Sequence, residues 1–462
     1  MPLGNSAASR DIAFNLHPYT HLKKHESDGP LMITEGRGIH VFDENGKEYI
    51  EGMAGLWCTA LGFGEQRLVD AAMRQMQKLP YYHIFNHKSH EAAAELAERL
   101  IALMPVPMSK VFFNNSGSEA NDSAVKMVWY YNNALGRHRK KKIIGRLRGY
   151  HGVTVAAASL TGLPNNHRDF DLPLGPVRHA DCPHYYRYAK PGESEEAFAT
   201  RLAESLEAQI LREDPETVAA FIAEPVMGAG GVILPPKTYF EKIQPVLRKY
   251  DVLLIADEVI CGFGRTGKMF GSETFAMKPD IMTMAKALSS AYLPISATVI
   301  SETLYRAFVA QSEKIGVFAH GFTYSAHPAC CAVALETLKI YEERDILGHV
   351  QKVSPVLLNG LRRFAAHRLV GEVRGVGLLA GVELVKDKAT KTPFDPKEGV
   401  GAMLAARAQE HGLILRAMVD TIALCPPLII SADEVEEMLR RFGRALDDTA
   451  KALAETGFVS VA

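Results

Sequence analysis

Three charged side chains stand where an apolar sequence normally excludes them. Glu224 closes the run FIAEP, Asp257 closes the run LLIADEV, and Lys286 lies between MTMA and ALSSA. A buried charge is costly without a partner, and burial favours the neutral, nucleophilic amine of a lysine. These residues therefore offer a nucleophilic amine together with two acids. Taken singly, Lys286 is also explained as a partly exposed structural lysine.

A second candidate is the small-residue turn NNSGSEAND at residues 114–122. It follows the strand-like residues 110–113 and precedes a predicted helix over residues 120–135. Free backbone N–H groups at the beginning of a helix bind anions such as phosphate. An ordinary helix cap made by Ser116 or Ser118 accounts for the same pattern.

The segment GYHG at residues 149–152 adds an aromatic ring, and Tyr150 suits either the core or a planar cofactor. A lysine, an acid, an anion-binding turn and an aromatic ring are together what pyridoxal 5′-phosphate (PLP) requires. In this interpretation Lys286 forms the Schiff base and then moves the substrate proton. Asp257, with Glu224 as its neighbour, keeps the pyridine nitrogen protonated.

The elements that position these residues alternate between strands and helices. Apolar runs at 218–226, 252–260, 280–285 and 296–301 predict buried strands, and the spacing in 239–250 predicts a helix. Such strands are typical of a mostly parallel sheet covered on both faces. Ligands bind at the carboxyl ends of these strands, which is where the two acids lie.

The two ends of the chain differ from this middle part. Residues 38–50 predict a hairpin around Asn45-Gly46, 370–385 and 413–430 predict strands, and 432–453 predict an amphipathic helix. We therefore expect an α/β fold with a large domain and a smaller α+β domain built from both termini. The expected boundaries are 1–51 and 326–462 for the small domain and 52–325 for the large PLP-binding domain.

Composition narrows the range of partners. The 462 residues hold 52 Lys and Arg against 53 Asp and Glu, a net charge of −1 that argues against nucleic-acid binding. Residues 315–335 are uncharged, but their histidines, glycines and proline favour a buried, interface-forming loop and helix over a membrane span. Residues 1–10 lack the apolar part of a secretory signal. Six cysteines, spaced for neither zinc nor a disulfide scaffold, favour free thiols in the cytoplasm and no metal site.

With these residues in place, the sequence resembles the class III PLP-dependent aminotransferases of fold type I, from about His17 to Leu446. The most specific stretches are FFNNSGSEAND (112–122), RGYHG (148–152), LLIADEVICGFGRTG (253–267), DIMTMAKALSSAYLP (280–294) and HGFTYSAHP (320–328). Within the class, AGLWC (54–58) and RAMVDTIALCPPL (416–428) are most similar to the amine– and polyamine–pyruvate branch, the omega-transaminases.

The resemblance implies a role for each matching position. The catalytic and cofactor-binding residues of one chain would be Lys286, Asp257, Ser116, Gly117, Ser118, Tyr150, His151, Glu224 and Val259. Phe322 and Thr323 would reach the phosphate of a partner subunit, which implies a homodimer with shared active sites, or a tetramer. The substrate pocket would be lined by Trp57, Phe85, Tyr150 and Arg416, with Arg416 binding the keto-acid carboxylate.

The expected activity is transfer of an amino group from a primary amine, such as an omega-amine or polyamine, to an α-keto acid, with pyruvate the first choice, in a ping-pong mechanism. An omega-amino acid donor of the β-alanine or 4-aminobutyrate type stays open, because Arg416 can hold its carboxylate too. An aminomutase, a racemase or a decarboxylating aminotransferase keeps the cofactor and changes the reaction. A non-catalytic PLP-binding protein would have lost Lys286 or Asp257.

The sequence departs from the family pattern at four places. Ala291, Ala326 and Val419 stand where the branch usually has glycine, and Ile295-Ser296 replaces a pair ending in glycine. None of these positions is a core PLP residue. The departures therefore bear on the substrate and leave the cofactor unaffected.

Overall fold

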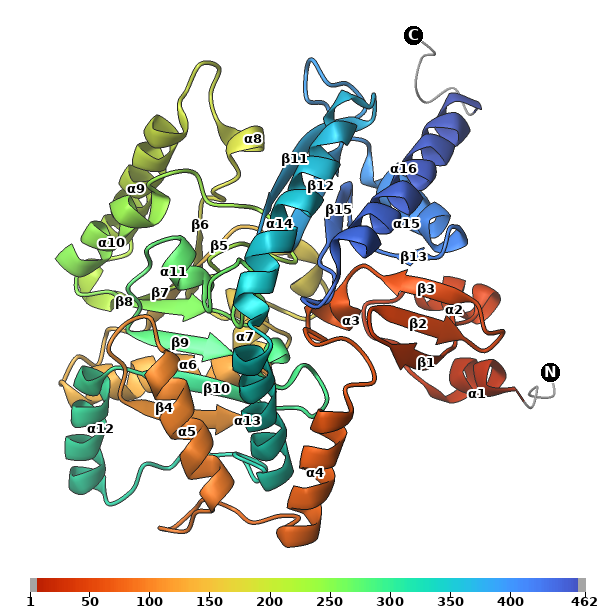
Figure 1. Ribbon diagram of the computed structural model, residues 1–462. Helices are drawn as coiled ribbons and strands as arrows, with labels where there is room; N and C mark the ends of the chain where they lie inside the picture. Colours follow the sequence, from red (N-terminus) through yellow and green to blue (C-terminus); the bar gives the residue numbers. More distant parts are fainter. Residues whose placement is uncertain (1–5, 456–462) are drawn as a thin grey trace.

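The computed structural model describes residues 6–455 and is built around a seven-stranded sheet in the order β4-β10-β9-β8-β7-β5-β6 (Figure 1). Strands β5 to β9 pair in parallel, and β10 is antiparallel to both of its neighbours. The predicted α/β fold is confirmed. The strands are β4 (Lys110–Asn114), β5 (Lys142–Arg146), β6 (Val177–Ala180), β7 (Val218–Ala223), β8 (Leu253–Asp257), β9 (Ile281–Met284) and β10 (Ser296–Ile300).

Helices pack on this sheet and bury β7 to β10 at every residue, as their apolar sequences require. The predicted helix 239–250 corresponds to α10. The helix predicted from residue 120 begins earlier, at Gly117, because the Oγ of Ser116 accepts the N–H of Glu119 at 3.2 Å and caps it. The helices are α4 (Gln66–Lys78), α5 (Glu91–Leu103), α6 (Gly117–Ala134), α7 (Val155–Leu160), α8 (Tyr185–Tyr188), α9 (Glu195–Arg212), α10 (Tyr239–Lys249), α11 (Gly271–Thr274), α12 (Glu302–Ile315) and α13 (Pro328–Glu343).

Two four-stranded sheets, β1-β2-β3-β13 and β11-β12-β15-β14, lie beside the central sheet. The predicted hairpin at 38–50 is confirmed as β2 and β3. Strand β13 pairs in parallel with β3, so the two ends of the chain meet in one sheet. The strands are β1 (Ile33–Arg37), β2 (His40–Asp43), β3 (Glu48–Glu51), β11 (Val370–Val376), β12 (Leu379–Leu384), β13 (Leu413–Ile414), β14 (Arg416–Met418) and β15 (Thr421–Leu424).

The remaining helices belong to the chain ends and the connections. The predicted helix 432–453 is α16. The strand predicted over 413–430 stops at Leu424, because the N–H of Cys425 bonds to the carbonyl of Gly52 at 2.7 Å and the chain leaves the ladder. The helices are α1 (Ala7–Phe14), α2 (Leu22–Asp28), α3 (Ala54–Trp57), α14 (Ile346–Arg362), α15 (Val400–Glu410) and α16 (Ala432–Glu455), with short 3₁₀ turns η1 (Pro164–Asn166), η2 (Pro215–Thr217), η3 (Lys286–Ser289), η4 (Arg363–Ala366) and η5 (Pro396–Glu398).

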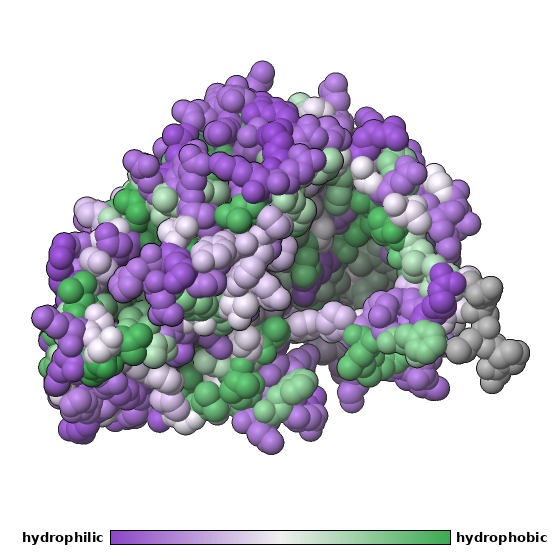
Figure 2. Space-filling model, turned by 90° about the horizontal axis from the view of Figure 1, so that it is seen from below, coloured by the Kyte–Doolittle hydropathy of each residue, from purple (hydrophilic) through white to green (hydrophobic). Residues whose placement is uncertain are grey.

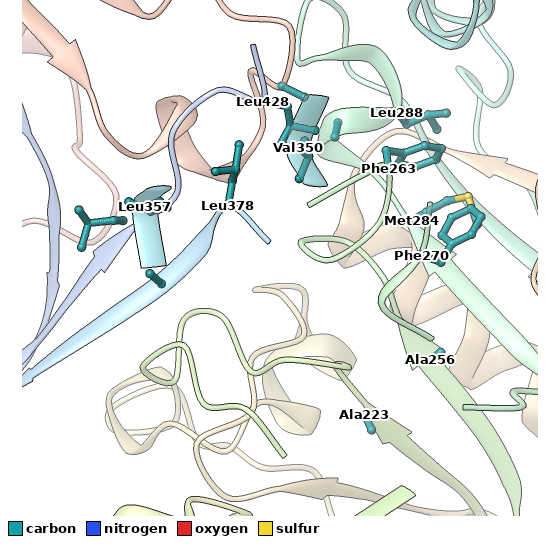
Figure 3. Close-up of a cluster of buried hydrophobic side chains, with 14 of the residues drawn as sticks. Ala223, Ala256, Phe263, Phe270, Met284, Leu288, Val350, Leu357, Leu378 and Leu428 are labelled. Atoms are coloured by element: carbon teal, nitrogen blue, oxygen red, sulfur yellow. The ribbon is translucent and has the colours of Figure 1, made fainter. Parts of the chain in front are cut away.

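One large hydrophobic cluster extends from the central sheet to α14 and the sheet of β11 (Figure 3). Ala223 and Ala256, the small residues near the ends of β7 and β8, belong to it. Successive side chains of a strand point to opposite faces. The residues that follow them, Glu224 and Asp257, are therefore directed away from this apolar cluster.

The uncharged stretch 315–335 divides into a loop and the beginning of α13. The helical part is buried and rich in small residues, as predicted. The loop is not buried in a single chain, since Thr323 and Tyr324 are exposed. No helix of residues 6–455 is long and apolar enough to cross a membrane.

Three of the four departures from the pattern that the sequence resembles fall at left-handed backbone positions. Ala291, Ala326 and Val419 have φ values of 62°, 55° and 57°. Val419 and Asp420 form the two-residue turn between β14 and β15, in which only Val419 has a positive φ. Hairpin turns with positive φ at the first position favour glycine there. A β-branched residue in this region is strained, so the departure costs stability.

Val419→Gly should raise the thermal unfolding midpoint. Left-handed backbone costs a non-glycine residue about 1–2 kcal/mol, and glycine loses about 0.5–1 kcal/mol through chain entropy, which leaves a net gain of about 1 kcal/mol. Val419 is 60% exposed, so little burial is lost. Val309→Gly, at a 40% exposed position in α12, is the control and should lower the midpoint. Equal losses in both variants, measured by calorimetry at one scan rate, would contradict the strain at Val419.

Candidate active site

The carboxyl end of the central sheet opens into a cavity of about 730 Å³. Figure 2 shows the molecule hollowed to the right of its centre, on the side where Figure 1 draws the N-terminal strands. Among the residues that the structure describes, the lining includes these predicted site residues: Trp57, Gly117, Ser118, Tyr150, His151, Glu224, Asp257, Val259, Lys286 and Arg416. Four others, Ser116, Phe85, Phe322 and Thr323, do not line it.

The carboxylate of Asp257 accepts three hydrogen bonds at the edge of the cavity. It is 3% exposed at the end of β8, and its Oδ2 accepts from His151 Nδ1 at 2.7 Å and Asn121 Nδ2 at 2.9 Å. Its Oδ1 accepts the N–H of Val259 at 3.1 Å. The Nδ1 of His151 must carry a proton to donate to a carboxylate, which fixes the tautomer of a neutral ring. Nε2 of His151 is buried without a hydrogen-bond partner.

A chain of hydrogen bonds fixes Asn121 in turn. Its Oδ1 accepts from the hydroxyl of Thr283 on β9 at 2.8 Å, and its Nδ2 also donates to the carbonyl of His151 at 2.7 Å. The amide therefore joins α6, β9 and the loop of His151 around one carboxylate. Because buried carboxylates need such donors, this network satisfies the carboxylate of Asp257 and holds it oriented toward the cavity.

Lys286 enters the cavity directly after β9 with a φ of 50°. Burial lowers the pKa of its ammonium group, and the charge of Asp257 acts in the opposite sense. An amine with a lowered pKa is more often neutral and nucleophilic at neutral pH. The structure thus brings a desolvated amine and a bonded carboxylate into one cavity.

The beginning of α6 forms one end of the cavity. Ser116 caps the helix, as one of the two sequence readings predicts, while Gly117 and Ser118 reach the lining. The N–H of Val153 donates to the Oγ of Ser118 at 3.0 Å, which leaves that hydroxyl proton free to donate. A helix cap and an anion-binding site can therefore exist together here, because Ser116 makes the cap while Gly117 and Ser118 face the cavity.

Tyr150 and Trp57 supply the aromatic walls. The N–H of Tyr150 donates to Oε1 of Glu224 at 3.0 Å, and Oε2 of Glu224 accepts the N–H of Gly228 at 2.9 Å. Burial raises the pKa of the Glu224 carboxyl. Burial and the hydroxyl of Tyr19 keep the pKa of Tyr150 above its usual value. Glu224 therefore fixes the backbone that carries the tyrosine ring.

Arg416 is half-buried on β14 and lines the cavity beside Leu415 and Ala417. The described residues form no ion pair with its guanidinium group. A planar guanidinium facing a cavity is suited to bidentate binding of a carboxylate. The strand therefore presents an anion-binding group to the same space as Lys286.

Phe85, Phe322 and Thr323 lie together at a different place on the chain. Phe85 is 39% exposed, and a Cβ added at Gly321 would come within 2.3 Å of its ring. The hydroxyl of Tyr81 donates to the carbonyl of Thr323 at 2.8 Å. Phe85 therefore does not line the cavity of its own chain, and the three residues lie together near the surface. Its place in a substrate pocket stays a prediction.

Several residues of the site carried no clear sequence signal. Asn121 lies in the stretch FFNNSGSEAND but has no distinctive spacing there, and Tyr19 is in the polar N-terminal region. Tyr19 reaches the cavity by way of the segment between α1 and α2 and accepts a hydrogen bond from Asn166. Only the folded chain brings these residues to the site.

The residues present fit PLP. A Cβ added at Gly117 would lie 2.9 Å from Cγ1 of Val259, and one added at Gly152 would lie 2.5 Å from Oγ of Ser118. Both glycines therefore keep room for a group to approach the backbone N–H groups of α6 closely. Lys286 supplies the amine and Asp257 the acid in the same cavity.

Comparison with known proteins agrees with this cavity. The family described as aminotransferase class-III matches residues 22–446. The gamma aminobutyrate transaminase 3 of Solanum lycopersicum, named chloroplastic, is 54% identical over 427 residues, 92% of this chain and 82% of its own length. The gamma-aminobutyrate transaminase 1 of Oryza sativa subsp. japonica, named mitochondrial, is 54% identical over 441 residues, 95% of this chain and 86% of its own.

Several solved structures are also similar to this chain. The omega transaminase from Pseudomonas jessenii in complex with PMP has a TM-score of 0.96 at 58% identity, covering 97% of this chain and 99% of that one. A thermostable omega transaminase variant with a tryptophan, a phenylalanine and an arginine replaced, engineered for asymmetric synthesis of enantiopure bulky amines, has the same TM-score and identity, covering 97% and 100%. The chain belongs to the class III aminotransferases, which are PLP-dependent transaminases of fold type I.

Proposed function

We propose that this transaminase moves an amino group from a primary amine, an omega-amine or polyamine, to an α-keto acid such as pyruvate. The observation that carries the proposal is one cavity that joins Lys286, Asp257, Trp57 and Arg416. An apolar aromatic wall accepts the carbon skeleton of an amine, and a guanidinium accepts the carboxylate of the keto acid. Because both substrates use one space in turn, the kinetics are ping-pong.

Bound PLP supplies an electron sink for the bond that breaks at the substrate carbon. Lys286 would hold the cofactor through its amine and would move the substrate proton, a task for which a lowered pKa is suited. The carboxylate of Asp257 would accept a hydrogen bond from the protonated pyridine nitrogen, and His151 with Asn121 keeps the carboxylate oriented. Gly117 and Ser118, next to the helix cap made by Ser116, would bind the phosphate end, and Tyr150 and Val259 would pack against the ring.

Phe85, Phe322 and Thr323 form a group that would serve a partner subunit. We infer a homodimer in which this group completes the neighbour's cavity, since Phe85 and Thr323 are exposed, Phe322 is only partly buried, and none of the three lines the chain's own cavity. We also propose that the chain divides into a large PLP-binding domain of residues 52–325 and a small domain of residues 1–51 and 326–462. Six cysteines without disulfides in the described chain support a reducing, cytoplasmic location.

A second candidate donor is an omega-amino acid such as 4-aminobutyrate. Arg416 favours it, because the guanidinium has no carboxylate partner in the described chain and can bind that of a donor. The names of the curated relatives point to the same donor class. A racemase would need no keto acid, and formation of the pyridoxamine spectrum with amine alone would exclude it.

Lys286→Ala should abolish turnover and the near-visible absorption of the PLP-loaded enzyme. Removal of the amine that holds the cofactor and moves the proton costs roughly 10⁴-fold in rate. Lys278→Ala, an exposed position just before β9, is the matched control and should leave both unchanged. Wild-type absorption and turnover in Lys286→Ala would overturn the assignment.

Arg416→Ala separates the two donor classes when the half-reactions are measured singly by stopped-flow absorbance. The keto-acid half-reaction should lose roughly 100-fold in kcat/KM, as expected when a buried charge partner is removed. A plain amine donor should keep its rate, and 4-aminobutyrate should lose as much as the keto acid. Arg444→Ala on the exposed face of α16 is the control. An unchanged keto-acid half-reaction would disprove the role of Arg416.

Sedimentation equilibrium tests the dimer. The expected particle has twice the mass of the 50.7 kDa chain, or a larger even multiple. A mixed dimer of Lys286→Ala chains and Thr323→Ala chains should contain one intact site and one doubly altered site. An active monomer would show that Thr323 serves no neighbour.

A further inference from the structure

The substrate wall contains a turn whose backbone is strained. This turn is the short element α3 (Ala54–Trp57), which is non-helical at Gly55 and Leu56. Its residues Ala54, Gly55 and Trp57 have φ values of 48°, 67° and 66°. Alanine and tryptophan pay about 1–2 kcal/mol each for this left-handed backbone. Gly55, Leu56 and Trp57 nevertheless line the cavity. Something in the surrounding structure must hold the turn in this shape.

The residue placed to do so is Glu51, the last residue of β3. It is 4% exposed, and its Oε2 accepts the N–H of Gly55 inside the turn. The N–H of Met53 also bonds to this carboxyl. Glu51 forms no ion pair within the described chain, so its buried polar group serves backbone donors alone.

Glu51 itself is held firmly. Its N–H donates to the carbonyl of Ile39 at 2.9 Å, and β3 pairs with β13, where Ile414 lies opposite Glu51. The carboxyl of Glu51 thus links the turn to a strand that is fixed in its sheet. We propose that Glu51 is a positioning residue that holds the left-handed turn Ala54–Trp57, and with it the tryptophan wall that selects the amine donor.

This inference rests on the proposed function, because it assumes that Trp57 meets the donor. Burial raises the pKa of the Glu51 carboxyl to about 7, against an ordinary value of 4.5. An opened turn would expose the carboxyl and restore the ordinary pKa. Ionisation between pH 6 and 8 therefore favours opening, and low pH favours the closed wall.

The other titratable groups near Glu51 are two thiols and two cationic side chains. The thiols are those of Cys58 and Cys425, and burial raises the pKa of both, that of Cys425 to about 11. Arg265 and Lys286 act on these thiols and not on Glu51 itself. A pH effect on the turn between pH 6 and 8 is assigned to Glu51 when it disappears in Glu51→Gln, because that variant changes only this carboxyl.

Fluorescence of the PLP-loaded enzyme tests the proposal without turnover. The chain has two tryptophans, so a Trp129→Phe background reports Trp57 alone. Glu51→Ala should raise the acrylamide quenching constant of Trp57 about threefold, as expected for a turn released from its anchor. In the background protein, quenching should rise from pH 6 to 8 with a midpoint near the pKa of about 7.

Glu51→Gln keeps an acceptor for Gly55 and cannot ionise, so its quenching should stay low and lose the pH dependence. This variant keeps the test decisive if Glu51→Ala fails to fold. Glu48→Gln, exposed on the same strand, is the control and should behave as the background protein. Quenching in Glu51→Ala equal to the control, or an unchanged pH profile in Glu51→Gln, would overturn the role of Glu51.

Donor preference separates this proposal from the proposed function. Glu51→Ala should raise the ratio of kcat/KM for a bulky amine to kcat/KM for a small amine by about tenfold. This factor is about the effect of losing one hydrogen bond. If Glu51→Ala raises the quenching constant but leaves this kcat/KM ratio unchanged, the role of Trp57 in binding the donor is refuted. The two failures are therefore distinguishable.

Discussion

A buried carboxylate at the end of a buried strand is the constraint on which the site depends. Asp257 follows an apolar strand and is almost without solvent, so it needs donors from elsewhere in the chain. His151, Asn121 and the backbone of Val259 provide them, and each comes from a different segment. The helix, the loop and the strand are therefore fixed relative to one another by one negative charge.

The groups of the site divide by origin. Lys286, Asp257 and the beginning of α6 come from the central sheet and its first helix, whereas Trp57 and Arg416 come from the N- and C-terminal parts. The residues expected to carry out the reaction and those expected to recognise the substrate thus lie on different elements. A change in the recognition part can therefore alter which substrate fits without displacing the buried charges.

Much of the central part could be predicted from the sequence, because its signals are local. Continuous apolar runs identify buried strands, and the acids that end them identify the ligand edge. Asn121, Tyr19 and Glu51 could not be found in this way. Their roles arise from contacts between segments that are distant in the chain, and a polar residue in a loop has no periodicity to mark it. The resemblance places Phe85 in a substrate pocket, but no local signal shows that its ring lies against Gly321, because that contact depends on the fold.

The parallel pairing of β3 with β13 has a consequence for the order of synthesis. Strand β3 ends at Glu51, but its neighbour is not made until residue 413 has left the ribosome. Until then an edge of β3 is unpaired, and the wall that Arg416 contributes does not exist. The central sheet can assemble first, since its strands end at Ile300. The reactive lysine is thus enclosed only after nearly the whole polypeptide is complete, and the nascent chain carries an open sheet edge for most of its elongation.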